Sequence, residues 1–520
     1  MRVLNVFAAE ADRASMLLTA ALRRSFTSGP VRGPLPADSG VKGMFSVFAD
    51  CGNCPPEAVR AAVRGGGKIM LTGTPGPDIM SVAGLKKAPD LRLPPEAAQA
   101  EHCFFEPFHE SAARITYTGH PPALTSPVRD RAFCRYDYAE WNNLGFGAVR
   151  VGGDFGVTGG VEADGADVLA RMTMTAARGV VELGPYMTLL DTPTASVLWC
   201  ARPVGPLDGT EWQVVERFFS DRRTGELPCL PYLLQTPRGT DCIVTMCMDC
   251  DEAVASCRDL FELYVQENIP FSVAVKTGQD LNGRDMALLR AIRASGGSIL
   301  SHSHDHARNW GSDHGAVKRD VRRSTAWFQR NLPEMPPPKL AVSPFHSNPV
   351  YAVQALEEAG IKGFVGGIID YDPEFLLGRA GRAPFARKIL TVSRQSMLHG
   401  DSYRNQGQSV AVHVRAFAAQ HQARGIFGYL DHPFSERYQY GWKSAEQRAT
   451  AHRQLLTAIR ERGGVMFLSQ EQCFAFVGAL ATAQLHMTDA GRVRAVCAPR
   501  TEFVLQYRLE GEERDLPGGV

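Results

Sequence analysis

The sequence lacks an excess of charge of either sign. Its 520 residues contain 56 lysines and arginines against 55 aspartates and glutamates, which gives a formal net charge of +1. Proteins that bind nucleic acids or anionic membranes over a broad surface need a basic field that this balance does not provide. We therefore expect no nucleic-acid partner, whereas self-association into a homo-oligomer stays open.

Long hydrophobic runs are also missing. No stretch of the sequence approaches the ~18 consecutive apolar residues of a membrane-spanning helix, so we expect no integral membrane segment. The first residues, MRVLNVFAAEADRASMLL, carry Glu10, Asp12 and Arg13 where a secretory signal would have its apolar core. The sequence thus predicts a cytoplasmic protein.

Cysteine gives no sign of a disulfide scaffold, because the chain has only 12 cysteines spread over its length. Cys51 and Cys54 form one CxxC pair. A zinc ribbon needs a second pair at similar spacing, and the sequence contains none. We interpret the pair as two thiols in a loop that opens a helix.

Residues 1–235 predict an α/β domain. GMFSVFAD (43–50) is a short apolar run typical of a strand, and PPEAVRAAVRGGG begins with proline and ends in glycines, as helices do. The later segments ASVLWCARPV and GTEWQVVERFFSD repeat this strand–helix order. The alternation predicts a mainly parallel sheet with helices on its faces, a sandwich of the flavodoxin-like or amidotransferase-like kind. No nucleophile–base set stands out in it, so we expect a non-catalytic domain.

A second domain is predicted after the proline-rich stretch at residues 227–241. From Cys242 onward about seven β/α units follow one another, a number that fits a closed or nearly closed (β/α) barrel. We place this barrel domain at residues 240–478. The segments AQLHMT, RVRAVCA and FVLQYRL then predict short strands, which form a small β appendage at residues 479–520.

Polar side chains cluster where the predicted barrel strands end. VTMCMDCDEA ends an apolar run in Asp249 and Asp251, and SILSHSHDHA carries His302 and His306. Further clusters follow later strands, at residues 343–346 and at Asp431 and His432. Because catalytic side chains of (β/α) barrels lie at the carboxyl ends of the strands, we expect these groups to converge.

The converging groups suit metal-assisted hydrolysis of an amide or ester. If the two histidines lie four apart on one helical turn, they face the same way. Together with one carboxylate they give three protein ligands for a divalent metal. The second carboxylate can then act as a general base and a distant histidine as a general acid. Taken singly, each pattern has a structural alternative, since a DxD at a strand end often caps the next helix.

Residues 242 to about 475 resemble the polysaccharide deacetylase family, also called the NodB-homology or carbohydrate esterase 4 family. TMCMDCDE is similar to a variant of the first family motif, which implies that Asp249 is the catalytic base and Asp251 a metal ligand. The second motif, H[ST]xxH, is met by His302 and His306, the other two implied ligands. The fifth motif places a leucine two positions before His432, which implies that this histidine is the catalytic acid. The resemblance implies a divalent metal, with Zn²⁺ as the first choice.

The third family motif departs from the pattern. It normally contains an arginine that pairs with the base aspartate, but here VSPF places Val342 at that position. Another cation would then have to set the pKa of Asp249. Arg308, Arg387 and Arg394 are the candidates that the sequence offers.

Two further positions stay open. The fourth motif contains an aspartate that orients the acid histidine, and either Asp370 or Asp372 could supply it. Inside the second motif, His304 could line the pocket and Asp305 could orient a ligand histidine.

These observations lead to one main functional hypothesis and two alternatives. The main hypothesis is a metal-dependent N-deacetylase that acts on an acetamido sugar, such as a glycan precursor, a glycolipid or a secondary-metabolite sugar. One alternative keeps the hydrolase and changes the substrate to a formyl group or a cyclic amide. The other is a catalytically inactive sugar-binding or scaffold protein, and Val342 is the observation behind it.

Overall fold

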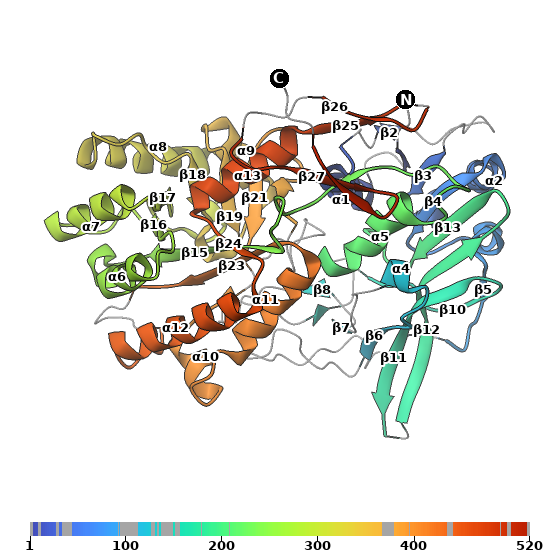
Figure 1. Ribbon diagram of the computed structural model, residues 1–520, viewed down its shortest axis with the longest axis horizontal. Helices are drawn as coiled ribbons and strands as arrows, with labels where there is room; N and C mark the ends of the chain where they lie inside the picture. Colours follow the sequence, from blue (N-terminus) through green and yellow to red (C-terminus); the bar gives the residue numbers. More distant parts are fainter. Residues whose placement is uncertain are drawn as a thin grey trace.

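A mixed nine-stranded sheet forms the centre of the first half of the chain (Figure 1). In this computed structural model the strand order is β2-β1-β3-β4-β13-β12-β11-β6-β7. The strands are β1 (Asn5–Phe7), β2 (Val31–Gly33), β3 (Phe45–Phe48), β4 (Gly67–Thr72), β6 (Ala113–Tyr117), β7 (Arg131–Ala132), β11 (Asp167–Ala176), β12 (Gly179–Asp191) and β13 (Ala195–Cys200). The helices of this half are α1 (Arg13–Ser25), α2 (Pro56–Gly65), α3 (Pro77–Met80), α4 (Pro122–Thr125) and α5 (Gly209–Asp221).

The structure describes residues 4–8, 12–27, 31–33, 44–91, 93, 113–125, 131–132, 135–136, 149–150, 156–177, 179–206, 209–366, 379–394, 396–433, 440–488, 490–496 and 501–516. Two short antiparallel pairs stand outside the main sheets of the first half. They are β5 (Leu85–Lys87) with β10 (Val161–Ala163), and β8 (Arg135–Tyr136) with β9 (Val149–Arg150).

The sheet of the first half is parallel only in part. Strands β2, β1, β3, β4 and β13 run parallel, as the sequence predicted, whereas β12, β11, β6 and β7 pair antiparallel. The antiparallel part is built on the long paired strands β11 and β12, which are separated by only two residues in the sequence. These two residues are not the Asn-Gly or Asp-Gly pair by which a sequence usually reveals a hairpin, so the antiparallel strands were not predicted.

The second half contains a ten-stranded sheet in the order β20-β21-β19-β18-β17-β16-β15-β23-β22, with β24 paired to β15. Except for β20, the strands pair in parallel, and this confirms the predicted α/β class. The strands are β15 (Cys242–Cys250), β16 (Ser272–Val275), β17 (Ser298–Ser301), β18 (Leu340–Val342), β19 (Gly363–Gly366), β20 (Gly381–Arg382), β21 (Leu390–Ser393), β22 (Ser396–Met397), β23 (Ile426–Asp431) and β24 (Val465–Phe467). The helices are α6 (Arg258–Gln266), α7 (Gly283–Ala294), α8 (His314–Asn331), α9 (Val350–Glu358), α10 (Gly400–Asn405), α11 (Ala411–Ala423), α12 (Ala445–Arg462) and α13 (Gln470–Thr482).

The two ends of this second sheet come near each other. Strand β21 lies next to the edge strand β20, and β22 is the opposite edge strand, yet only two residues separate β21 from β22 in sequence, so the two ends of the sheet must approach each other. No hydrogen-bonded pairing joins β21 to β22 among the described residues. Most of the strands contribute an apolar residue to one buried cluster: Ile243, Ala274, Leu300, Val342, Val365, Val392 and Ile426.

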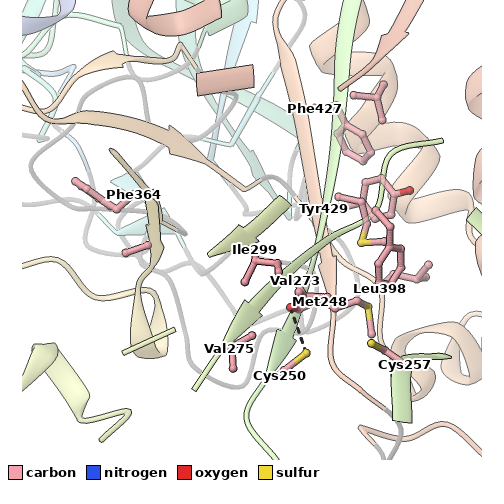
Figure 2. Close-up of a cluster of buried hydrophobic side chains, with 14 of the residues drawn as sticks. Met248, Cys250, Cys257, Val273, Val275, Ile299, Phe364, Leu398, Phe427 and Tyr429 are labelled. Atoms are coloured by element: carbon pink, nitrogen blue, oxygen red, sulfur yellow. Dashed lines mark hydrogen bonds between the residues drawn. The ribbon is translucent and has the colours of Figure 1, made fainter. Parts of the chain in front are cut away.

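Strand β15 shows how alternation positions the site. All nine of its residues are buried, because Ile243 and Cys247 on one face pack into the buried cluster named above and the other face packs against the helices. Figure 2 shows the helix-facing side, where Met248 and Cys250 pack with Val273, Val275 and Cys257. Since successive side chains of a strand point to opposite faces, Asp249 lies on the interior side.

The two halves share a buried boundary. Strand β14 (Tyr232–Leu233) pairs with β27 (Gln506–Leu509) of the C-terminal tail, and β27 continues into β28 (Glu512–Asp515). The tail also contains the hairpin of β25 (Gln484–Met487) and β26 (Val493–Val496). Glu216 of α5 forms a buried ion pair with Arg379 of the second half.

Within the described ranges, no helix has the length and the apolar character that crossing a bilayer requires.

Candidate active site

Two acidic residues mark the carboxyl end of β15. Asp249 is the penultimate residue of the strand, and Asp251 follows directly after it. Asp249 is almost completely buried, with 1% of its surface exposed, whereas Asp251 keeps partial exposure. The pair therefore presents one buried carboxylate and one partly exposed carboxylate.

Arg394 supplies the cation that the third motif lacks. Its Nη1 and Nη2 donate to Oδ2 and Oδ1 of Asp249 at 2.5 and 2.8 Å, a bidentate pair between two buried side chains. Burial alone would raise the pKa of Asp249, but the charge of Arg394, together with His302, lowers this pKa to about 2. Of the other two candidates, Arg308 lies over the ring of Phe345, and Arg387 precedes β21, at the opposite end of that strand from Arg394.

Val342 has a different role from the motif arginine. Its side chain is buried in the interior cluster, beneath the site. Its backbone carbonyl lies 3.1 Å from Nδ1 of His302. With a proton on Nδ1 donated to that carbonyl, Nε2 of the histidine keeps its lone pair.

His302 and His306 converge, but not through a helical turn. His302 directly follows β17, and residues 302–307 are not helical, so the expected helix is wrong. Instead, Ser303 and His306 have left-handed backbone φ angles of 66° and 52°, which fold the segment back on itself. The Oγ of Ser303 accepts the N–H of His306 at 2.8 Å and so closes this turn.

The predicted ligand atoms point at one another. Oδ1 of Asp251 lies 3.1 Å from Nε2 of His302 and 3.3 Å from Nε2 of His306, and the two Nε2 atoms are 3.0 Å apart. Among the described residues, these three form the group whose spacing could hold a metal ion. Oδ1 of Asp251 is buried, and no donor among the described residues makes a well-formed hydrogen bond to it. A buried, acceptor-rich set of two imidazoles and one carboxylate fits a divalent cation.

The electrostatics of Asp251 and His306 agree with this arrangement, whereas for His302 burial is outweighed by the charges of Asp249 and Asp251, which raise the pKa. Burial raises the pKa of Asp251, but His302, whose Nε2 lies 3.1 Å away, outweighs burial when it is protonated and lowers this pKa well below its usual range. Burial, followed by the charge of His302, lowers the pKa of His306 to about 4. Asp251 is therefore an anion and His306 a neutral imidazole at neutral pH, which are the forms that bind metal.

His432 follows β23 and faces the same centre. Its Nε2 lies 3.7 Å from Oδ2 of Asp251, and its Nδ1 lies 2.9 Å from Nε2 of His399. The ring of Tyr440 stacks on His432 with centroids 3.8 Å apart and an interplanar angle of 10°. The hydroxyl of Tyr440 donates to Oδ2 of Asp251 at 3.0 Å.

His399 and Tyr440 are site residues that the sequence did not reveal. His399 follows β22, a strand of two residues that is too short to leave a pattern. The two residues are brought together by a close backbone approach, in which the N–H of Gly400 donates to the carbonyl of Tyr440 at 2.9 Å. A Cβ on Gly400 would lie 2.2 Å from the backbone N of Trp442, so glycine is needed there.

A buried polar network supports His432 from behind. Oδ1 of Asp431 accepts the N–H of His432 at 2.7 Å and Nε1 of Trp442 at 3.1 Å. Its Oδ2 lies 3.2 Å from Nε2 of His452, whose Nδ1 meets the hydroxyl of Tyr264 at 2.9 Å. These contacts fix the end of β23 and with it the position of His432.

Other residues inside the second motif have structural contacts. His304 Nδ1 lies 2.9 Å from Oγ1 of Thr277, and Asp305 pairs with Arg323 at 2.6 Å on the surface. The described contacts of Asp305 do not include a ligand histidine, so the expected orienting role is wrong. Asp370 and Asp372, the candidates of the fourth motif, lie outside the described residues.

Comparisons with known proteins found similar solved structures but no similar sequences. No family model matches the sequence, and no curated protein matches it. Solved structures similar to this chain include polysaccharide deacetylases and other members of carbohydrate esterase family 4, the family that the motifs resemble.

Three of these structures show the extent of the likeness. The chitin deacetylase of Colletotrichum lindemuthianum is 14% identical, covers 46% of this chain and 89% of its own, and has a TM-score of 0.32. A family 4 acetyl xylan esterase from Clostridium thermocellum is 14% identical, covers 45% of this chain and 90% of its own, and has a TM-score of 0.30. A family 4 pseudoenzyme from Bacillus anthracis is 11% identical, covers 42% of this chain and 61% of its own, and has a TM-score of 0.28. The functional argument therefore rests on the side chains of the site itself.

Proposed function

We propose that this protein is a metal-dependent hydrolase that removes an N-acetyl group from an acetamido sugar. The proposal rests on one observation. The proposed ligands Asp251, His302 and His306 meet beyond the carboxyl ends of β15 and β17, and Asp249 and His432 lie beside them. Two imidazole nitrogens and a carboxylate oxygen directed at one point are a donor set that suits a divalent cation. A metal bound there could promote hydrolysis.

Asp251, His302 and His306 would hold the metal, and Zn²⁺ suits their nitrogen and oxygen donors. When bound, such a cation polarises a carbonyl oxygen and lowers the pKa of water. The carbonyl of Val342 orients His302, and the hydroxyl of Tyr440 orients Asp251, so each ligand has a second contact that fixes its direction.

Asp249 and His432 would carry the proton transfers. Asp249 is kept ionised by Arg394, so it can accept a proton from the water whose oxygen bonds to the acetyl carbon. When the carbon–nitrogen bond breaks, the leaving nitrogen takes a proton from His432. The products are acetate and the free amino sugar.

The alternative hypothesis of a catalytically inactive sugar-binding or scaffold protein loses the observation on which it was based. It was based on Val342 in place of the motif arginine, and Arg394 now provides a buried, bidentate guanidinium for the same aspartate. A hydrolase for another amide uses the same residues, so only the substrate distinguishes it. Release of acetate from an acetamido sugar, rather than formate or ring opening, supports the proposal over that alternative.

The two aspartates provide a matched experiment. Asp249→Asn should retain the metal, while turnover falls by roughly 10² to 10⁴, the usual contribution of a positioned general base. Asp251→Asn should lose metal affinity, because an amide oxygen is a poorer ligand than a carboxylate, and excess metal should restore part of its activity. Full activity in Asp249→Asn would overturn the proposed mechanism.

A further inference from the structure

A cavity of about 560 Å³ lies where the two halves of the molecule meet, away from the candidate active site. One wall is a face of α1 from Met16 to Arg24, continued by Phe26 and Thr27 just after the helix, and α1 lies at the junction in Figure 1. The other walls are residues 380–387, which contain β20, and the end of α13. Residues 380–387 precede β21, whereas Arg394 follows that strand, so the cavity and the catalytic aspartate lie at opposite ends of β21.

The charge around this cavity has one sign. Four arginines line it, namely Arg23 and Arg24 from α1 and Arg382 and Arg387 from the opposite wall. No aspartate or glutamate is found among the described residues that line it.

Acidic groups close to these walls already have partners. Glu357 accepts backbone N–H groups of residues 387–389. Glu216 is paired with Arg379 and accepts the hydroxyl of Ser25 at 2.6 Å. The acidic side chains of the packed helices are remote, because Asp12 caps the far end of α1 and Glu471 stands in the first turn of α13. Among the described residues, the charged side chains that line the cavity are therefore all positive.

The wall is built to hold one of the arginines in place. Arg24 is only 6% exposed, and its Nη1 and Nη2 donate to the carbonyls of Arg379 and Arg382 at 3.0 and 2.9 Å. Its stem lies against Gly381, where an added Cβ would come within 2.6 Å of Arg24 Cγ. The sequence thus places a glycine where the arginine needs room, and a buried cation stands at the base of a basic hollow.

We propose that this interdomain cavity binds a small molecule that carries a phosphate group. Arginine is the side chain best suited to phosphate, because its planar guanidinium donates two parallel hydrogen bonds to two phosphate oxygens. The volume falls in the range of small-molecule sites and exceeds what a single inorganic ion fills. The bound anion offsets the mutual repulsion of four arginines and bridges the two halves.

Titration calorimetry of the full chain with inorganic phosphate and with pyrophosphate tests this proposal. Pyrophosphate also binds divalent cations, so each titration is done on metal-loaded and on chelator-treated protein. Binding in the cavity appears in both forms, whereas binding at a metal centre appears only in the loaded form. The double variant Arg23→Gln with Arg387→Gln changes two exposed side chains, and Arg322→Gln on α8 is the matched exposed control.

We expect pyrophosphate to bind chelator-treated wild-type protein, and the double variant to weaken this binding by about tenfold or more. Arg322→Gln should bind as wild type does. Absence of binding in the chelated protein overturns the proposal, and so does equal binding by the double variant. A third titration uses citrate, a tricarboxylate. Tighter binding of citrate than of pyrophosphate would overturn the assignment to phosphate.

Discussion

At the scale of single residues, the pairing of Asp249 with Arg394 is the most informative contact of the site. The family motif would place an arginine on β18, where this chain has Val342. Arg394, directly after β21, supplies the positive charge instead, and it lies 145 positions from Asp249 in the sequence. The clustering of the three proposed ligands could be predicted because their motifs are local, but the pairing could not, because three arginines were equally compatible with the sequence.

Arg394→Met tests how far Asp249 depends on this pair. The substitution leaves a buried carboxylate without its cation, so we expect the free energy of unfolding to fall by about 3–5 kcal/mol. Urea denaturation of chelator-treated protein measures this loss without a contribution from bound metal. Arg387→Met serves as control and should change stability little, because that side chain is exposed. Equal stability of the Arg394 variant and wild type would contradict the assigned pairing.

His399 is expected to position His432 rather than to touch substrate. Replacement by phenylalanine removes the hydrogen-bond partner of Nδ1, so the acid histidine loses its fixed orientation. We expect kcat to fall by about 10- to 100-fold with little change in KM or metal content. His399→Gln, which keeps a polar group at the position, should recover part of kcat. A fall in metal content with unchanged kcat of the loaded enzyme would argue against this role.

At the scale of elements, buried strands and helices were the predictable part of the fold. Strands such as β13 and β15 are continuous apolar runs because both of their faces are covered. The segment after β17 was predicted wrongly as a helical turn. Its left-handed residues are serine and histidine rather than glycine, so backbone conformation gave no sequence signal.

Asp320 of α8 holds that segment in place. Its carboxylate accepts the backbone N–H groups of His304 and Asp305 at 2.8–3.1 Å, and these two residues lie between the two proposed histidine ligands in sequence. We expect Asp320→Ala to weaken metal affinity by about 10- to 100-fold, because the ligands then lose their shared support. Competition with a chromogenic chelator measures this affinity.

The control is Asp313→Ala, which removes the N-cap of the same helix but does not contact the ligand segment. It should lower helix stability and leave metal affinity unchanged. The N–H of Ala316 lowers the pKa of Asp313, so the stabilisation by this cap is present above its ordinary pKa and is lost as the pH falls below it. Equal loss of metal affinity in both variants would point to helix α8 as a whole rather than to Asp320.

At the scale of the whole molecule, the two halves are joined by buried polar contacts and by the C-terminal tail. We propose that the first half is non-catalytic and supports the second half, since Glu216 of α5 pairs with Arg379 and β27 pairs with β14. The tail was predicted as a separate appendage, and its strands were recognisable. The pairing of β27 with Tyr232–Leu233 could not be predicted, because a strand of two residues leaves no pattern in the sequence.

Arg379→Met should therefore weaken the boundary between the halves. The change leaves Glu216 buried without its cation, and we expect a loss of about 3–5 kcal/mol in the free energy of unfolding. The substituted side chain is remote from the ligand set, so metal content of the folded protein should not change. Unfolding followed by tryptophan fluorescence measures the loss, and exposed Arg322→Met is the control. A stability equal to wild type would show that this pair does not hold the halves together.

The most direct test of the central claim joins metal content to acetate release in the full chain. Acetate is measured enzymatically over a panel of acetamido sugars, with metal-loaded protein, chelated protein and chelated protein resupplied with Zn²⁺. We predict one metal per chain, acetate release in the loaded form, loss of release on chelation and its return with Zn²⁺. Release that persists after complete metal removal, or a fully loaded chain that releases no acetate from any sugar in the panel, would contradict a metal-dependent sugar N-deacetylase.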